Sequence, residues 1–134
     1  MPRYMLDTNM VIYLMKNQPE EVARRFAQCY VGDVVMSAIT FAELEYGVAV
    51  CQNPAQEKLK LANLAKDILV LPFDQNAAIA YGPIRGATRD SKKDHLDKLI
   101  AAHAVALDVV LVTNNLKDFA KYPGLKAENW LDAA

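Results

Sequence analysis

Hydrophobic and polar positions divide the chain into short apolar runs and longer stretches with helical spacing. Short runs of β-compatible residues between polar turns predict strands at 4–6, 34–37, 68–71 and 109–113. Apolar residues at helical spacing predict helices at 20–29, 40–50, 54–67, 74–89 and 94–107. This alternation is typical of an α/β fold with a central parallel sheet and helices on both faces. We expect a single domain spanning residues 1–134, in which the apolar stretch around Trp130 either closes the sheet edge or packs on it.

The composition is that of a globular protein. Hydrophobic residues make up 53% of the chain, and its net charge of −1 excludes a strong overall basic surface of the kind that marks many nucleic-acid binders. A local basic patch remains compatible with that charge. Cys29 and Cys51 form neither a CxxC motif nor a metal-ligand spacing, which favours free thiols in a reducing compartment. Because no apolar run reaches membrane-spanning length and no signal-peptide pattern is present, we expect a cytoplasmic protein without membrane contact.

Asp7 interrupts the first apolar run where the predicted strand ends. Ligands of open α/β sheets bind outside the carboxyl ends of the strands, so a carboxylate at this position faces the region where a ligand would bind. Asp and Asn are also common in turns, and this segment alone favours neither interpretation. The choice depends on whether other carboxylates reach the same place.

Further oxygen ligands are expected at the same edge of the sheet. Glu43 lies three residues after Thr40, the spacing of a capping box, and Asp97 lies in the first turn of a predicted helix. Helix capping or the helix dipole explains either acid taken alone. Asn115 and Asp118 follow the last predicted strand and approach the same edge. Clustered carboxylates repel one another unless a cation binds them, and hard oxygen ligands favour Mg²⁺ or Mn²⁺.

Four segments of the chain carry these acids or the polar end of the last strand. They are Met5-Leu6-Asp7-Thr8-Asn9, Thr40-Phe41-Ala42-Glu43-Leu44-Glu45-Tyr46-Gly47, Asp97-Lys98-Leu99-Ile100-Ala101-Ala102-His103-Ala104 and Leu111-Val112-Thr113-Asn114-Asn115. In order and spacing they resemble the motifs of PIN-domain ribonucleases, most closely VapC toxins of bacterial toxin–antitoxin pairs. The resemblance implies a metal-dependent endoribonuclease whose catalytic, metal-binding acids are Asp7, Glu43 and Asp97. Where the family often has a fourth acid this chain has Asn115, and Asp118 is the alternative fourth ligand.

The resemblance also implies partners and a target. It implies a toxin that inhibits translation by cleaving structured RNA such as tRNA, a small VapB-type antitoxin that covers the site, and a homodimer. Hydroxyl and amide groups beside the acids are expected to orient carboxylates, water or phosphate: Thr8, Asn9, Thr113 and Asn115. Positive side chains near Asp97 are expected to guide the RNA backbone, unless they form an ordinary solvated helix face: Arg85, Arg89, Lys93 and Lys98.

Two other classes of protein remain open from the sequence. An aspartate-nucleophile phosphohydrolase also places an Asp after its first strand, but its common form has a second acid where this chain has Asn9. A non-catalytic PIN-like module would keep the fold and bind RNA or a protein partner. A nucleophilic triad is not supported, because neither His95 nor His103 has a convincing Ser or Cys partner in the sequence. His103 is expected to pack within its helix and His95 to be exposed.

Overall fold

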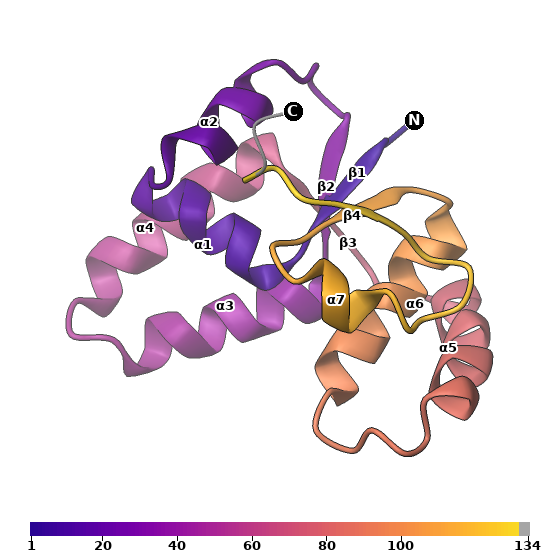
Figure 1. Ribbon diagram of the computed structural model, residues 1–134. Coiled ribbons are helices and arrows are strands. Elements are labelled where there is room, and N and C mark those ends of the chain that lie inside the picture. Colours follow the sequence, from indigo (N-terminus) through magenta and orange to yellow (C-terminus); the bar gives the residue numbers. More distant parts are fainter. Residues whose placement is uncertain (132–134) are drawn as a thin grey trace.

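The computed structural model describes residues 1–131 as a parallel sheet with helices on both faces (Figure 1). The strands are β1 (Tyr4–Leu6), β2 (Val34–Ser37), β3 (Leu69–Leu71), β4 (Val110–Val112) and β5 (Lys126–Glu128). Their order in the sheet is β3-β2-β1-β4-β5, and every neighbouring pair is parallel. In the central strand, Met5 pairs with Val35 on one side and with Leu111 on the other. The carboxyl ends of the strands therefore meet at one edge of the sheet.

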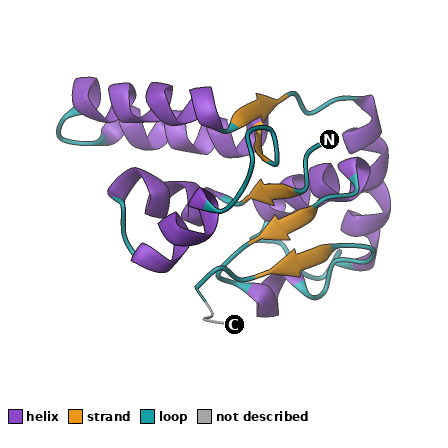
Figure 2. Cartoon of the chain, turned by 90° about the horizontal axis from the view of Figure 1, so that it is seen from above, coloured by secondary structure: helices purple, strands orange, loops and turns teal. Residues whose placement is uncertain are grey.

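Helices connect successive strands and cover the two faces of the sheet (Figure 2). They are α1 (Thr8–Lys16), α2 (Glu20–Ala27), α3 (Ala38–Val50), α4 (Pro54–Asp67), α5 (Gln75–Ala87), α6 (His95–Leu107) and the short α7 (Leu116–Phe119). One core includes side chains from α1, α2, α3 and α4, and the other includes side chains from α5, α6 and α7. The predicted α/β fold with helices on both faces is confirmed.

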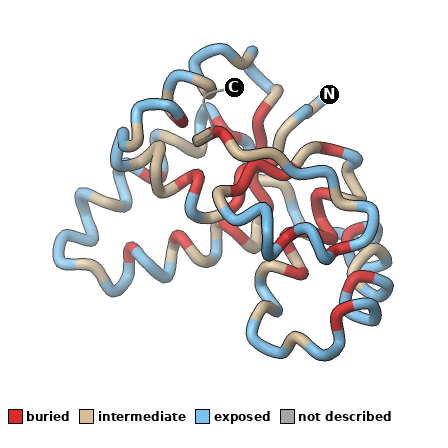
Figure 3. The backbone as a smooth tube through the Cα atoms, viewed as in Figure 1, coloured by how far each residue is buried: buried red, intermediate tan, exposed pale blue. Residues whose placement is uncertain are grey.

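Alternate residues of the strands enter the two cores. Leu6 and Val112 belong to the core on the α1–α4 face, whereas Met5 and Leu111 belong to the core on the α5–α6 face. All four side chains are fully buried, and Figure 3 shows buried residues concentrated along the sheet. Strands buried on both faces are apolar at every position, which is why they form short continuous apolar runs in the sequence. Full burial of such a side chain contributes roughly 1.5–3 kcal/mol to the stability of the folded state.

The predicted elements are confirmed, with differences at their ends. The strand at residues 34–37 and the helix at 54–67 have the predicted bounds, and Asp74 is the N-cap of α5, where its Oδ1 accepts from the N–H of Ala77 at 3.0 Å. The segments α1, α7 and β5 are not among the predicted elements. Lys126–Glu128 closes the sheet edge, and Trp130 is buried against Tyr4, so both alternatives for the C-terminal segment hold. The predicted domain end at residue 134 lies outside the described residues.

The predicted capping box at Thr40 is wrong. Helix α3 begins at Ala38, and its N-cap is Ser37, whose Oγ accepts a hydrogen bond of 3.1 Å from the backbone N–H of Ile39. Thr40 therefore lies inside the helix and is fully buried. The hydroxyl of Ser37, directly at the end of β2, caps the helix before Thr40 is reached. Glu43 is consequently placed on α3 by helix geometry rather than by a capping role.

No helix within residues 1–131 is long and apolar enough to cross a membrane.

Candidate active site

Asp7 stands at the carboxyl end of β1 and is the N-cap of α1. Its Oδ1 accepts a hydrogen bond of 3.0 Å from the backbone N–H of Met10, and its own N–H donates to the carbonyl oxygen of Val112 at 3.0 Å. These bonds hold the carboxylate between β1 and β4, with 6% of the residue exposed. Asp7 thus has a structural role as the N-cap of α1, and its position is also the sheet edge at which α/β proteins bind ligands.

The charge of Asp7 is energetically unfavourable where it lies. Burial raises the pKa of the Asp7 carboxyl group to about 6, because a low-dielectric surrounding disfavours the charged form. Hydrogen bonds from the Thr113 hydroxyl and the Met10 amide oppose this rise. The negative charges of Asp97 and Glu43 add to it. Acids from three separate segments are thus close enough to affect one another electrostatically.

Asp97 lies in the first turn of α6, as predicted. Burial is the largest cause that raises the pKa of its carboxyl group, and the negative charge of Glu43 is the next. Asp94 and Asp118 raise it further, whereas Lys121 lowers it. Asp97 is therefore coupled both to the acid on α3 and to the acid on α7.

Glu43 is tied to the first turn of α1. The hydroxyl of Thr8 donates a hydrogen bond of 2.7 Å to Oε1 of Glu43, and both side chains are partly buried. This contact orients the Glu43 carboxylate toward the segment that follows Asp7. The neighbouring Asn9 is exposed in the same turn of α1.

The polar residues after β4 form a local hydrogen-bonded unit. The backbone N–H of Asn115 donates to Oγ1 of Thr113 at 3.0 Å, and its side-chain Nδ2 donates to Oδ2 of Asp118 at 2.6 Å. Thr113 is fully buried, whereas Asn115 and Asp118 are exposed. The side chains of Asn115 and Asp118 thus lie next to each other at the start of α7. The neighbouring Asn114 donates from Nδ2 to the hydroxyl of Tyr13 at 2.8 Å.

The chemistry of these donors fits a hard divalent cation. The acids offer only oxygen as a ligand atom. The charges of Glu43 and Asp97 raise the pKa of Asp7, and the charge of Glu43 raises that of Asp97; a bound cation would relieve this repulsion. Among residues 1–131, no group of three His, Cys, Asp or Glu side chains stands ready to hold a metal ion. The site therefore has a suitable donor set that is not assembled into a finished coordination shell.

The expected basic rim is only partly exposed. Arg85, Arg89 and Lys93 are exposed on α5 and on the loop that follows it. Lys98 is 1% exposed, so its predicted place on an RNA-guiding rim is wrong. The reason is that its ammonium group is directed inward, onto backbone carbonyl oxygens and the carboxylate of Asp94. The i,i+4 spacing of Asp94 and Lys98 is the signal in the sequence from which this ion pair could have been predicted.

His103 has a serine partner that the sequence did not suggest. Its Nδ1 lies 2.7 Å from Oγ of Ser37, and both residues are buried. Because Ser37 Oγ already accepts from the N–H of Ile39 at the start of α3, its own proton is free to be donated to His103. The pair joins the end of β2 to α6 inside the protein, and its burial excludes a nucleophilic role at the surface. The expectation that His103 packs within the fold is confirmed, and His95 is exposed as expected.

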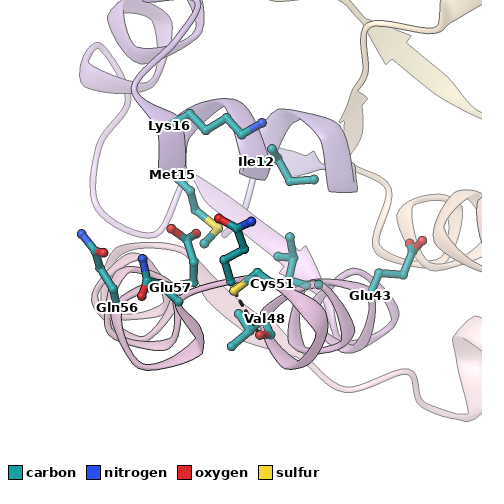
Figure 4. A pocket seen from close by; sticks show the side chains of 12 residues that line it. Ile12, Met15, Lys16, Glu43, Val48, Cys51, Gln56 and Glu57 are labelled. Atoms are coloured by element: carbon teal, nitrogen blue, oxygen red, sulfur yellow. Dashed lines mark hydrogen bonds between the residues drawn. The ribbon is translucent and has the colours of Figure 1, made fainter.

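A largely apolar groove of about 500 Å³ begins beside the acids. It is lined by side chains of α1, α3, the turn after α3 and α4, among them Ile12, Met15, Leu44 and Val48. Figure 4 shows Glu43 at one end of the labelled residues and Gln56 at the other. Glu43, which is hydrogen-bonded to Thr8 beside Asp7, therefore lies at one end of the groove.

Comparisons with known proteins show which family the chain resembles. The family model described as PIN domain matches residues 4–125. The curated "tRNA(fMet)-specific endonuclease VapC" of Salmonella typhimurium is 36% identical over 132 residues, covering 97% of this chain and 99% of the relative. "Ribonuclease VapC2" of Haemophilus influenzae is 36% identical over 135 residues, covering 98% of this chain and 100% of the relative.

Solved structures show the same likeness in three dimensions. A DNA-bound VapBC structure from Salmonella typhimurium has a TM-score of 0.89 and 36% sequence identity, with 97% of this chain and 99% of that chain covered. VapBC-1 from nontypeable Haemophilus influenzae has a TM-score of 0.85 at 35% identity, with 96% of this chain and 98% of that chain covered.

Proposed function

Because the chain belongs to the PIN-domain family and to its VapC ribonucleases, we propose that it is the toxin of a VapB–VapC pair and an endoribonuclease dependent on Mg²⁺ or Mn²⁺. The observation that carries this proposal is the electrostatic coupling of three acids from separate segments, Asp7, Glu43 and Asp97, at one edge of the sheet. Protonation or a bound cation relieves repulsion among acids coupled in this way, and a bound cation would also supply the chemistry of phosphodiester hydrolysis.

Asp7, Glu43 and Asp97 are the residues that would hold the metal ion. When bound, the ion would lower the pKa of an attacking water and stabilise the charge on phosphate oxygens. Thr8 and Thr113 would hold the carboxylates of Glu43 and Asp7 in place through the hydrogen bonds described above. Asn115 and Asp118, joined by their own hydrogen bond, would complete the site at the start of α7.

The substrate that we propose is structured RNA, with initiator tRNA as the first candidate. The Salmonella typhimurium and Shigella flexneri relatives carry the name tRNA(fMet)-specific endonuclease at 36% and 35% identity. The exposed cations Arg85, Arg89 and Lys93 would contact the RNA backbone, because phosphate contacts position a nucleic acid without reading its sequence. Cleavage of a tRNA would inhibit translation, and such a toxin would act in the cytoplasm.

The partner that we propose is a VapB antitoxin. The structural neighbours named above were solved as VapBC assemblies. The apolar groove along α3 ends at Glu43, so a segment seated there would reach the acids with its next residues. An Arg or Lys side chain of that segment would replace the metal ion as the charge partner of the carboxylates. We also expect the toxin to form a homodimer, as its family commonly does.

The decisive experiment is expression of the toxin without its antitoxin, followed by sequencing of the new RNA ends. Discrete cuts within tRNA are expected, and they should be absent when Asp7→Asn is expressed at the same level. Purified protein should reproduce the cuts only with Mg²⁺ or Mn²⁺ and should form no phosphoryl-enzyme on Asp7. The same tRNA cuts in cells that express folded Asp7→Asn would refute the assignment of the site.

A further inference from the structure

Lys98 is a buried cation that is held by three oxygen atoms. Its ammonium group lies 3.0 Å from the carbonyl oxygen of Thr88, 2.6 Å from that of Ser91 and 3.3 Å from Oδ1 of Asp94. The two carbonyl oxygens accept hydrogen bonds from the ammonium, whereas Oδ1 of Asp94 is its ion-pair partner. The residue is 1% exposed, and burial of an ammonium is tolerated only with such pairing. Lys98 therefore ties the loop between α5 and α6 to the first turns of α6.

Asp94 extends this network to a third segment. Its Oδ2 accepts a hydrogen bond from the hydroxyl of Tyr122 and lies 2.9 Å from the ammonium of Lys121. Lys121 in turn donates to Oγ of Ser91 at 3.2 Å. Tyr122 and Lys121 belong to the turn between α7 and β5, so Asp94 joins the start of α6 to the segment that follows α7.

Asp94 is the N-cap residue of α6, yet its side chain forms no capping hydrogen bond. Helix ends without a cap leave N–H groups unpaired and fray readily. Asp97 lies in this uncapped first turn, and Asp118 lies on α7. The contacts of Asp94 thus substitute for a cap in holding the turn that carries Asp97 against the segment that carries Asp118.

We propose that Asp94, held by Tyr122 and Lys98, is a positioning residue that sets the carboxylate of Asp97 for binding of the divalent metal ion. This inference rests on the proposed function, because it needs Asp97 to be a metal ligand. Ligands must be held within fractions of an ångström of their productive positions, and residues one shell away commonly control this. The role of Lys98 is structural and electrostatic, and it does not contact the RNA.

The test is calorimetric titration of Mn²⁺ into purified Tyr122→Phe, Asp94→Asn and the double variant. Tyr122→Phe removes one hydroxyl and keeps the ring that packs edge-to-face on Phe119. We expect each single variant to bind Mn²⁺ about 3- to 10-fold more weakly. The double variant should bind Mn²⁺ less weakly than the product of the two single effects predicts, because both changes act on the same contact between Tyr122 and Asp94. Asp108→Asn, which breaks the distant ion pair with Lys126, is the matched control and should bind Mn²⁺ like the wild type.

Melting temperature is measured alongside, because a merely structural role would lower it without changing affinity for the metal. Folded Tyr122→Phe protein that binds Mn²⁺ within about twofold of the wild type would overturn the positioning role. Wild-type protein that binds no Mn²⁺ would overturn the proposed metal site and this inference with it. The two failures are distinguishable, since the first leaves wild-type binding intact. Should Asp94→Asn fail to fold, Tyr122→Phe still decides the question.

Discussion

The hydroxyl of Thr8 donates a hydrogen bond of 2.7 Å to Oε1 of Glu43, which joins the first turn of α1 to α3. Thr8 follows Asp7 directly in the chain, whereas Glu43 is brought to it by the packing of α3. This contact thus ties Glu43, one proposed metal ligand, to the residue that follows Asp7, another proposed ligand. Its loss should release the Glu43 carboxylate without removing any acid.

Thr8→Val is expected to lower RNA cleavage about tenfold, since Val keeps the shape of Thr but cannot donate to the carboxylate. The Mg²⁺ concentration needed for half-maximal cleavage should rise with it. Thr8→Ser retains the hydroxyl and should cleave at close to the wild-type rate. Cleavage of a defined tRNA across a Mg²⁺ series measures all three proteins. Equal metal dependence of Val and Ser variants would show that the hydroxyl has no such role.

Asp7→Asn should abolish cleavage and growth inhibition while increasing stability in the presence of a chelator. Asn keeps the N-cap bond to Met10 but removes a buried charge. The wild-type pKa of about 6, against an ordinary 3.8, makes the charged carboxyl destabilising at neutral pH. We expect the variant to gain about 1–3 kcal/mol in free energy of unfolding near pH 7. This difference should narrow as the pH falls from about 6 toward 4, where the wild-type carboxyl is protonated, and denaturant unfolding in EDTA measures it.

Substitutions of Asn115 and Asp118, at the start of α7, should change the Mg²⁺ dependence of cleavage in opposite directions. If Asp118 is a ligand, Asp118→Asn should raise the Mg²⁺ concentration for half-maximal cleavage. Asn115→Asp should lower it, or restore the activity of Asp118→Asn, because an added acid strengthens attraction for a divalent ion. The hydrogen bond between the two side chains makes this compensation sterically plausible. An unchanged metal dependence, with only a lower melting temperature in Asp118→Asn, would assign Asp118 a structural role.

Stability should fall at mildly acidic pH because of His103. Burial lowers the pKa of its imidazole below the ordinary 6.5, and the negative charge of Asp74 partly opposes this. The unfolded chain therefore binds this proton at higher pH than the folded protein does. The contribution of His103 to stability is complete above about pH 6.5 and is lost as the pH falls toward the lower pKa of the folded state. Unfolding curves between about pH 7.5 and about pH 5 should show a smaller acid loss for His103→Gln than for the wild type, and parallel curves would contradict the prediction.

Antitoxin binding and metal binding should exclude each other. A cationic antitoxin side chain among the acids would neutralise the charge that attracts the metal ion. Calorimetry with Mn²⁺ should therefore detect binding to the free toxin and none to the purified complex. Equal binding to both would show that the antitoxin blocks RNA access in another way.

Local sequence pattern determined the fold class and the position of the acids. The strands are apolar at every position because both faces of the sheet are covered, and the helices carry their apolar residues at helical spacing. Asp7 ends a strand and Asp97 begins a helix, so their common edge follows from the topology of parallel sheets. The roles assigned to these acids as metal ligands stay predictions.

Tertiary structure alone decided what each polar side chain contacts. A lysine such as Lys98 is expected at the protein surface from its residue type. The loop that precedes α6 covers the face on which Lys98 lies, so its charge is buried. Ser37 meets His103 across a long separation in sequence, and Tyr122 meets Asp94 in the same way. Such contacts depend on how helices pack against a sheet, and periodicity within one segment carries no information about the partner from another. Residue spacing therefore determined where the acids lie along the chain, and packing determined which neighbours orient them.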